Sequence, residues 1–470
     1  MTRAMNSQKW ALFLKVNLGV FVLIVLQGCN SSQKQDKEHL VFKYNEHSNI
    51  ATLDPAFARN PQTIWPSNQL FNGLVQLDDQ LNIQPDIAKS WHINDSTSTY
   101  TFTLRDDVYF HKNKVFKKDS TRSVVAQDFV YSFDRLLSPE LASPGSWVFN
   151  AVQRYHAAND STLVIQLNKP FPAFLGLLSM RYCSVVPKEA IAYYGNDFRS
   201  NPVGTGPFRF KFWEENVKLV LRKNPMYFEK DTQGNRLPYL EAVAITFLPD
   251  KQSEFLQFAQ GNIDFMTGLD NSYKDEIITT KGTLQPKYKD RVQLITTPYL
   301  NTEYLGFFMG STTKEIASPL IRQAINYGFD REKMVTYLRN GMGIAATHGF
   351  IPKGLAGFDS IQGYSYNPEK ARALINRYKQ ATGATSIEVT IGTNSQYLDL
   401  CEYIQRELEK LGISIKIDVM PPATLRQLKS SGELDIFRAS WVADYPDAEN
   451  YLSLFYSPNF TPNGPNYTHF

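Results

Sequence analysis

A strand–helix–strand pattern near the C-terminal end restricts the fold of this chain more than any other feature. Residues 386–391 and 414–419 alternate apolar and polar side chains, which is typical of half-buried β-strands. Between them, residues 397–411 repeat apolar side chains at helical spacing until Gly412, a residue type that commonly ends helices. The apolar residues of this helix are Leu398, Cys401, Ile404, Leu408 and Leu411. Strands joined in this way are parallel with a right-handed crossover, and such open sheets bind ligands beyond the carboxyl ends of their strands.

Strand-like and helical patterns also alternate along the rest of the chain, which predicts an α/β fold. Residues 368–379 form a helix with one apolar stripe, and Pro368 suits its first turn. The stripe consists of Ala371, Leu374, Ile375 and Tyr378. Strand-like runs occur at residues 40–44, 101–105, 162–167, 217–221 and 243–248. A strand-rich part changes into a helix-rich part at residues 298–310, which we interpret as a domain boundary.

The N-terminus has the layout of a secretory signal. Three basic residues and no acidic residue precede Cys29, and residues 16–26 are mostly apolar. The alternative is an uncleaved membrane anchor, but Lys15 and Asn17 interrupt the apolar run, and a bilayer span needs about 20 residues. Both interpretations place the rest of the chain outside the cytoplasm.

A cysteine that directly follows such a run resembles the lipobox of bacterial lipoproteins. This resemblance implies that residues 1–28 are a signal peptide and that Cys29 is lipidated and becomes the first residue of the mature chain. The polar residues up to 39 then form a short tether. The protein would be anchored by lipid on the periplasmic or extracellular face of a bacterial membrane.

Composition excludes some classes of partner. The 470 residues are enough for two or three domains. Without the leader, the chain has 46 basic and 46 acidic residues, a balance that argues against nucleic acid or an anionic membrane as partner. Aromatic residues make up 13% of the chain, which fits either large cores or an aromatic-lined cleft.

Cysteine and histidine residues give no metal or cofactor site. Cys183 and Cys401 could pair in an exported protein, but the position of Cys401 on an apolar helix face favours a buried free thiol. The seven histidines are scattered, with no spacing typical of a metal site. No nucleophile–base arrangement of a hydrolase is visible either.

Short segments along the whole chain resemble one known family. They are residues 52–55, 70–75, 85–91, 126–135, 202–208, 224–228, 321–331 and 367–371. In this order they are similar to family 5 of the bacterial extracellular solute-binding proteins, the oligopeptide- and dipeptide-binding lipoproteins of ABC importers. Each segment alone is weak evidence for the family, whereas the ordered set over some 400 residues is highly specific.

Two features within these segments also have chemical interpretations. Gly204-Thr205-Gly206 could cradle a phosphate, but it lacks the spacing of known phosphate loops and Pro207 removes a donor, so we predict a structural turn. Asp54 and Asp128 could be catalytic carboxylates, but their positions beside a proline and at a helix start suit turns and caps.

The resemblance implies a bilobal type II periplasmic-binding-protein fold of the large, three-domain kind. Residues 40–74 and 200–290 would form lobe 1, residues 75–199 an inserted domain, and residues 291–470 lobe 2. The family continues into a further helix beyond the segment that ends at Phe470, so a C-terminal tail is expected to be missing.

The segment Trp441 to Tyr451 is the strongest candidate for ligand contact. It follows a strand-like run, and in the family the counterpart of Asp444 holds the α-amino group of a bound peptide. A carboxylate suits that role, because an ammonium group that leaves water needs a charged partner. Trp441 and Tyr445 would flank the cleft. The alternative is that Asp444 only caps the next helix, for which Asp447 is the better candidate.

A second cleft-lining loop is expected around Asn340, Gly341 and His348, again by resemblance. Dipeptide binders also hold the ligand carboxylate with an arginine, and no arginine of this chain can be assigned to that role from the sequence.

The implied function is capture of peptides between two lobes and their delivery to a membrane permease, by a monomer that is not an enzyme. One alternative is the same fold with a nickel complex, an opine or an oligosaccharide as cargo. The other is an extracytoplasmic hydrolase.

Overall fold

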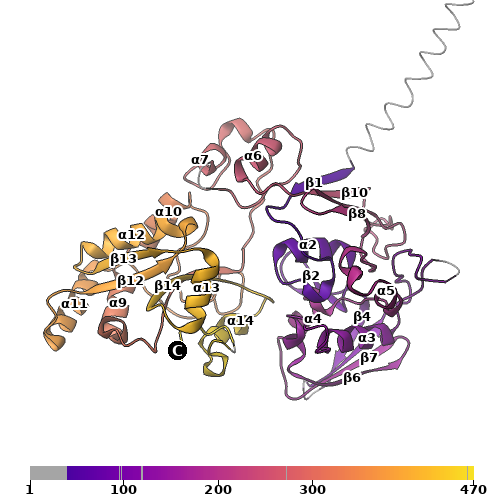
Figure 1. Cartoon of the computed structure of the whole chain (residues 1–470), viewed down its shortest axis with the longest axis horizontal. Helices are drawn as coiled ribbons and strands as arrows, with labels where there is room; N and C mark the ends of the chain where they lie inside the picture. The colour runs from indigo at the N-terminus through magenta and orange to yellow at the C-terminus, as the bar shows by residue number, and fades with distance from the viewer. Residues whose placement is uncertain (1–39, 95, 97, 118–119, 271–272, 463) are drawn as a thin grey trace, which may run out of the picture. The chain divides into compact units, whose positions relative to one another are not determined.

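The computed structural model describes residues 40–470 except 95, 97, 118, 119, 271, 272 and 463. Cys29, the predicted leader and the predicted tether lie outside the described residues. The chain divides into two compact units, of which unit 1 ends at Gly268 and unit 2 runs from Leu269 to Phe470 (Figure 1). The sequence prediction placed this division at residue 290 instead, and the further separation of an inserted domain stays a prediction.

Unit 1 contains a mixed four-stranded sheet in the order β1-β10-β9-β8. β1 (Val41–Asn45) is parallel to β10 (Ala242–Thr246), whereas β9 (Lys218–Lys223) and β8 (Phe208–Glu214) continue the sheet in antiparallel fashion. The strand that begins the described fold therefore pairs with one about 200 residues later. This pairing makes unit 1 depend on contacts that are distant in sequence.

A second sheet of unit 1 is antiparallel, in the order β4-β5-β7-β6. Its strands are β4 (Ala88–Ile93), β5 (Thr99–Leu104), β7 (Thr162–Leu167) and β6 (Val152–Asn159). Every second residue of β5 and β7 is buried, because one face of the sheet packs on α3 and its neighbours. The remaining elements are the hairpin β2 (Val75–Leu77) and β3 (Ile83–Pro85), and the helices α2 (Pro61–Leu70), α3 (Ala126–Leu137), α4 (Phe174–Leu178), α5 (Lys188–Tyr194) and α6 (Lys251–Ala259).

The aspartates of the ordered segments have structural roles, as predicted. Asp54 caps a short 3₁₀-helix by accepting from the Ala56 amide at 3.1 Å, and its carboxylate also binds the Arg135 guanidinium at 2.5 Å. Asp128 accepts from the Val125 amide at the start of α3 and pairs with Arg122 at 2.7 Å. Both carboxylates are buried, so their arginine partners compensate charges that have lost water.

The Gly204–Gly206 turn is also structural, as predicted. A β-carbon on Gly204 would lie 2.0 Å from the Leu70 carbonyl oxygen, and one on Gly206 would lie 2.5 Å from that of Gln69. His111 closes the turn, because its Nδ1 accepts from the Gly204 amide and its Nε2 bonds the Gly206 carbonyl. The turn is buried and serves as a contact with the end of α2.

A buried acidic pair lies beyond the carboxyl ends of β1 and β10. Glu46 and Glu254 are 4% and 0% exposed, and Glu254 lies 3.2 Å from His47 Nε2 and 3.7 Å from Lys251 Nζ. Burial, and secondarily the charge of Glu254, raises the pKa of Glu46 to about 7. Above that pH, Glu46 becomes a buried carboxylate beside the acidic side chain of Glu254.

Glu46→Gln is therefore expected to stabilise the protein at alkaline pH, by about 2 kcal/mol near pH 8. The raised pKa means that the folded state keeps a proton which the unfolded state releases, so the wild type loses stability as pH rises through 7. Glutamine has the shape of the protonated acid and no charge, so the variant does not lose stability as pH rises. Urea denaturation at several pH values checks this, and the difference between the two proteins should vanish below about pH 5.

Unit 2 is built on a four-stranded sheet in the order β11-β14-β12-β13. β12 (Glu388–Thr393) and β13 (Ser414–Val419) are parallel and connected by α12 (Leu398–Glu409), which confirms the strand–helix–strand prediction. β14 (Ile436–Val442) is parallel to β12, and β11 (Asn301–Phe307) is antiparallel to β14. The other helices are α7 (Lys274–Ile277), α8 (Lys314–Ala317), α9 (Pro319–Tyr327), α10 (Arg331–Leu338), α11 (Pro368–Thr382), α13 (Pro422–Ser431) and α14 (Ala448–Leu452).

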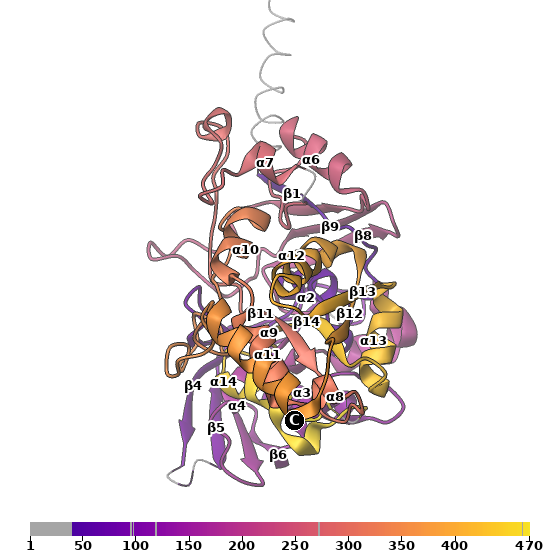
Figure 2. The same ribbon diagram turned by 90° about the vertical axis from the view of Figure 1, so that its left-hand side faces the viewer.

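The helices of unit 2 bury the apolar faces that the sequence predicted. All four residues of the α11 stripe are buried, and α11 packs beside α9 (Figure 2). Cys401, Ile404 and Leu408 of α12 join the same core together with Ile391 of β12. Cys183 and Cys401 are both buried free thiols, which confirms the prediction for Cys401.

Two sequence interpretations of unit 2 need correction. Residues 298–310, interpreted as a boundary, contain β11. β14 extends to Val442, so Trp441, which was expected to follow the strand, belongs to it. The reason for both differences is the pairing of β11 with β14, in which Thr302 faces Trp441.

Candidate functional site

The candidate site lies at one edge of the unit 2 sheet. β12, β13 and β14 run in the same direction, so their carboxyl ends meet at this edge. β14 ends at Val442, and the loop 443–447 connects it to α14. Asp444 and Tyr445 therefore stand where sheets of this class bind ligands.

Asn450 holds this loop in place. Its side-chain oxygen accepts a hydrogen bond from Trp441 Nε1 at 2.7 Å and another from the Asp444 amide at 3.3 Å. The residue is 3% exposed, so the two bonds are shielded from water. Sequence reasoning missed Asn450, because an amide in the first turn of a short helix has no pattern that indicates what it will bond.

Asp444 is the residue of the loop best placed to bind a cation. It is exposed, and its carboxylate receives no ion pair from the described residues. Surrounding protein nevertheless shields the carboxyl group enough to raise its pKa, while the Asn450 side chain lowers it. Asp447 caps α14 by accepting from the Glu449 amide at 2.8 Å, as predicted, so that role does not require Asp444.

Tyr445 is the buried residue of this loop. Its hydroxyl donates to Glu449 Oε2, and burial together with this carboxylate raises the pKa of the phenol. Tyr445 thus ties the loop to α14, whereas Trp441 at the end of β14 is half-buried.

The segment around His348 reaches the same end of the sheet. Thr302, the cross-strand neighbour of Trp441, donates to the Phe350 carbonyl at 2.9 Å. The Phe350 ring lies 6.2 Å from that of Tyr451 in α14. His348 is exposed two residues earlier, with its ring 5.8 Å from Phe358.

Asn340 and Gly341 follow Arg339, whose guanidinium pairs at 2.6 Å with Asp399 in the first turn of α12. Because α12 starts shortly after the carboxyl end of β12, this ion pair brings the loop near the same edge. The Asn340 amide oxygen accepts from Lys274 Nζ at 2.9 Å, and its nitrogen donates to Asp275 at 2.7 Å. These bonds tie the end of α10 to the segment around α7, which is why residues 269–290 belong to unit 2. Gly341 has a φ of 69°, a left-handed conformation that suits glycine. A contact of either residue with ligand stays a prediction.

Arg438 is a second charged residue that sequence reasoning missed. It lies in β14, 9% exposed, with its guanidinium carbon 3.1 Å from the centre of the Tyr397 ring. It pairs with Glu303 on β11, yet its Nε has no hydrogen-bond partner among the described residues. Burial lowers its pKa to about 9. The signal in the sequence was a single basic residue within the strand-like run 434–438.

Within the described part of the chain, no group of three or more histidine, cysteine or acidic side chains is arranged to hold a metal ion. None of the helices described there combines the length and apolar character that crossing a bilayer requires.

The fold and the site together define a class of protein. Two α/β units, with a charged loop at the carboxyl edge of parallel strands, are typical of proteins that bind a solute. The chain belongs to the bacterial extracellular solute-binding proteins, family 5, whose family model matches residues 82–463.

Individual relatives agree with this membership. The chain is 24% identical over 421 residues to the glutathione-binding protein GsiB of Salmonella typhi, covering 88% of this chain and 77% of that protein. It is 28% identical over 462 residues to heme-binding protein A of Haemophilus influenzae, covering 92% and 81%. Among solved structures, the periplasmic binding protein DppA of Helicobacter pylori in complex with the peptide STSA matches with a TM-score of 0.70 and 25% identity, covering 92% and 84%. These findings confirm the expected family and the bilobal α/β periplasmic-binding-protein fold.

Proposed function

We propose that this protein captures peptides outside the cytoplasm and delivers them to the permease of an ABC importer. Membership of a solute-binding family supports the general role, and the glutathione- and peptide-binding relatives support the cargo. The observation that carries the proposal is the position of Asp444, an acidic side chain at the ligand-binding edge of the sheet with no cation of its own.

In this proposal the Asp444 carboxylate binds the N-terminal ammonium group of the peptide. The ammonium loses water as it enters the site, and a charge-assisted hydrogen bond to a carboxylate offsets that loss. Asn450 orients the loop through the Asp444 amide, so the carboxylate is positioned before the ligand arrives. Trp441, Tyr445 and the loops of His348 and of Asn340 and Gly341 would surround the ligand.

Arg438 is our candidate for the carboxylate end of the ligand. Its Nε has no partner among the described residues and can donate one more hydrogen bond. Arginine suits this role because the planar guanidinium matches the geometry of a carboxylate. The peptide backbone between the two charged ends would be held by main-chain hydrogen bonds. Such bonds do not depend on the side chains of the peptide, so selectivity for peptide sequence would be low. No bond is made or broken, so the protein acts as a binding protein and not as an enzyme.

The ligand would act by favouring a closed state of the two units, and the permease would recognise that state. Lipidation of Cys29 would keep the protein at the membrane, and a single copy of the chain would suffice.

We expect Cys29→Ser to release the protein from the membrane fraction, because a serine cannot carry the thioether-linked lipid. Fractionation and mass spectrometry of the N-terminal peptide check this. An unmodified Cys29 within an uncleaved N-terminal peptide of the wild type would instead support a membrane anchor.

Mass spectrometry of ligand that co-purifies with the protein tests the cargo directly. Calorimetry with short peptides and with cello-oligosaccharides then compares the two classes of solute. Peptide binding without cleavage products is expected, whereas oligosaccharide binding alone, or hydrolysis of the peptides, would refute the proposal.

A further inference from the structure

Unit 1 has a concentration of positive charge on β8 and β9. Arg209, Lys211, Arg222 and Lys223 surround a surface hollow of about 300 Å³, whose lining contains one acidic residue, Glu241. We call these four basic residues, together with Lys112, the β8–β9 basic surface. The chain without its leader is formally neutral, which argues against attraction of the whole chain to an anionic membrane. Any such attraction must therefore come from a local concentration of charge such as this one.

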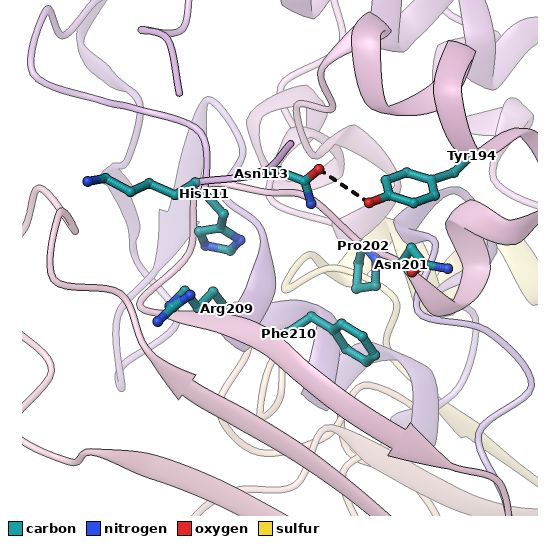
Figure 3. Close-up of a pocket in the computed structure, with 8 residues that line it drawn as sticks. His111, Asn113, Tyr194, Asn201, Pro202, Arg209 and Phe210 are labelled. Carbon is teal, nitrogen blue, oxygen red and sulfur yellow. Dashed lines mark hydrogen bonds between the residues drawn. The ribbon is translucent and has the colours of Figure 1, made fainter. Parts of the chain in front are cut away.

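Figure 3 shows a second hollow, of about 150 Å³, which shares Arg209 with the first. Lys112 also lines this second hollow. In this hollow the Arg209 side chain lies near the His111 ring (Figure 3). His111 contributes no charge, because both ring nitrogens bond the backbone and burial lowers its pKa to about 4. The charge of the surface therefore comes from lysine and arginine alone.

Arg209 and Arg222 are direct cross-strand partners in the β8–β9 pairing. Like charges in that position destabilise a sheet, unless an anion lies between them. Neither arginine forms an ion pair or side-chain hydrogen bond with any described residue, and the only ion pair at the surface joins Lys223 to Glu241 at 3.5 Å.

Two other arginines of unit 1, Arg199 and Arg105, each have an acidic partner. Arg199 pairs with Glu215 at 3.0 Å, and Arg105 pairs with Asp107 at 2.9 Å. The fold can thus supply acidic partners, but it leaves Arg209 and Arg222 without one. An arrangement of this kind suits an external anion.

We propose that the β8–β9 basic surface binds the phosphate groups of anionic lipid headgroups and docks unit 1 on the membrane. β8 is the edge of the sheet that begins with β1, and eleven residues separate β1 from Cys29. Fully extended, such a segment spans at most about 40 Å, so lipidation at Cys29, as proposed above, would keep this sheet close to headgroups. The larger hollow is lined by charged residues only, which suits headgroups and does not suit an apolar ligand.

The test measures sedimentation with vesicles, using the mature chain, residues 29–470, with Cys29→Ser, so that neither the leader nor an attached lipid contributes. Vesicles of equal parts phosphatidylglycerol and phosphatidylcholine should bind the protein, pure phosphatidylcholine should not, and salt should weaken the binding. Each basic residue near an anionic surface contributes about fivefold in affinity, so Arg209→Gln with Arg222→Gln should weaken binding at least tenfold.

Arg372→Gln with Arg377→Gln is the matched control, because both arginines are exposed on α11 of unit 2 and the change in net charge is the same. Binding of this control should be unchanged. The Arg209/Arg222 variant should melt no lower than the wild type, because it relieves a like-charge pair. Lys211→Gln with Lys223→Gln provides a second variant if the first folds poorly.

Equal binding by the wild type and both surface variants would overturn the proposal, and so would an equal loss in the α11 control. A third outcome is that vesicles do not bind, while inorganic phosphate raises the melting temperature of the wild type but not of the surface variants. That result would overturn membrane docking and assign the surface to a soluble anion. Because peptide affinity is measured separately, a failure here leaves the proposed transport function untouched.

Discussion

Asp444→Ala is expected to weaken the binding of a peptide with a free N-terminus by about 2 kcal/mol or more, roughly thirtyfold. The variant leaves the ligand ammonium without its charged partner in a site that has excluded water. Isothermal titration calorimetry with a peptide identified from the co-purified ligand gives this difference directly.

An N-acetylated form of the same peptide is the matched control. Acetylation removes the ammonium, so it should cost the wild type about as much as the mutation does, and it should cost Asp444→Ala little. This cycle isolates the contact between the two charges. Independent losses that simply add would show that Asp444 acts elsewhere.

The pH dependence of binding has a defined direction. Because the pKa of Asp444 is raised in the free protein, the carboxylate is lost at a higher pH than an ordinary aspartate would lose it. Peptide affinity should therefore fall as pH is lowered through that raised pKa. Asp444→Asn should bind weakly at every pH and lack this dependence.

Arg135→Ala is expected to lower the free energy of unfolding of unit 1 by about 3–5 kcal/mol. The mutation leaves the Asp54 carboxylate buried without its cation. Asp54 is 4% exposed, and two nitrogens of the Arg135 guanidinium bond its carboxylate. Chemical denaturation followed by tryptophan fluorescence measures the effect.

The exposed pair Arg199–Glu215 is the control for this effect. Arg199→Ala should cost no more than about 1 kcal/mol, because water solvates the remaining carboxylate. Similar losses in the two variants would contradict the argument that burial makes the Arg135–Asp54 pair costly to break.

Local pattern was sufficient for several elements of unit 2. The apolar stripes of α11 and α12 and the parallel strands β12 and β13 follow from spacing alone, because each element buries one face and repeats at a characteristic period. β11 escaped detection since its residues, Asn301–Phe307, alternate poorly and its partner β14 lies about 130 residues later.

The candidate site also contains some residues that the sequence could assign and others that it could not. Asp444 and Asp447 could be assigned by resemblance and by capping chemistry, whereas Asn450 and Arg438 could not. Their roles depend on which side chains a distant strand or a following helix brings near. Asn340 was expected in a cleft-lining loop, and the structure adds that its amide already bonds Lys274 and Asp275.

The amino-acid sequence by itself determined the family, the α/β class, the periodic helices and strands, and the acidic loop after the last strand. Those properties depend on residues close together in the chain or on an ordered set of short segments. Only the tertiary structure decided that Trp441 belongs to a strand, that Asn450 orients Asp444, and that Arg209 faces Arg222 without an acidic partner. Each of those depends on long-range pairing, which local periodicity does not encode.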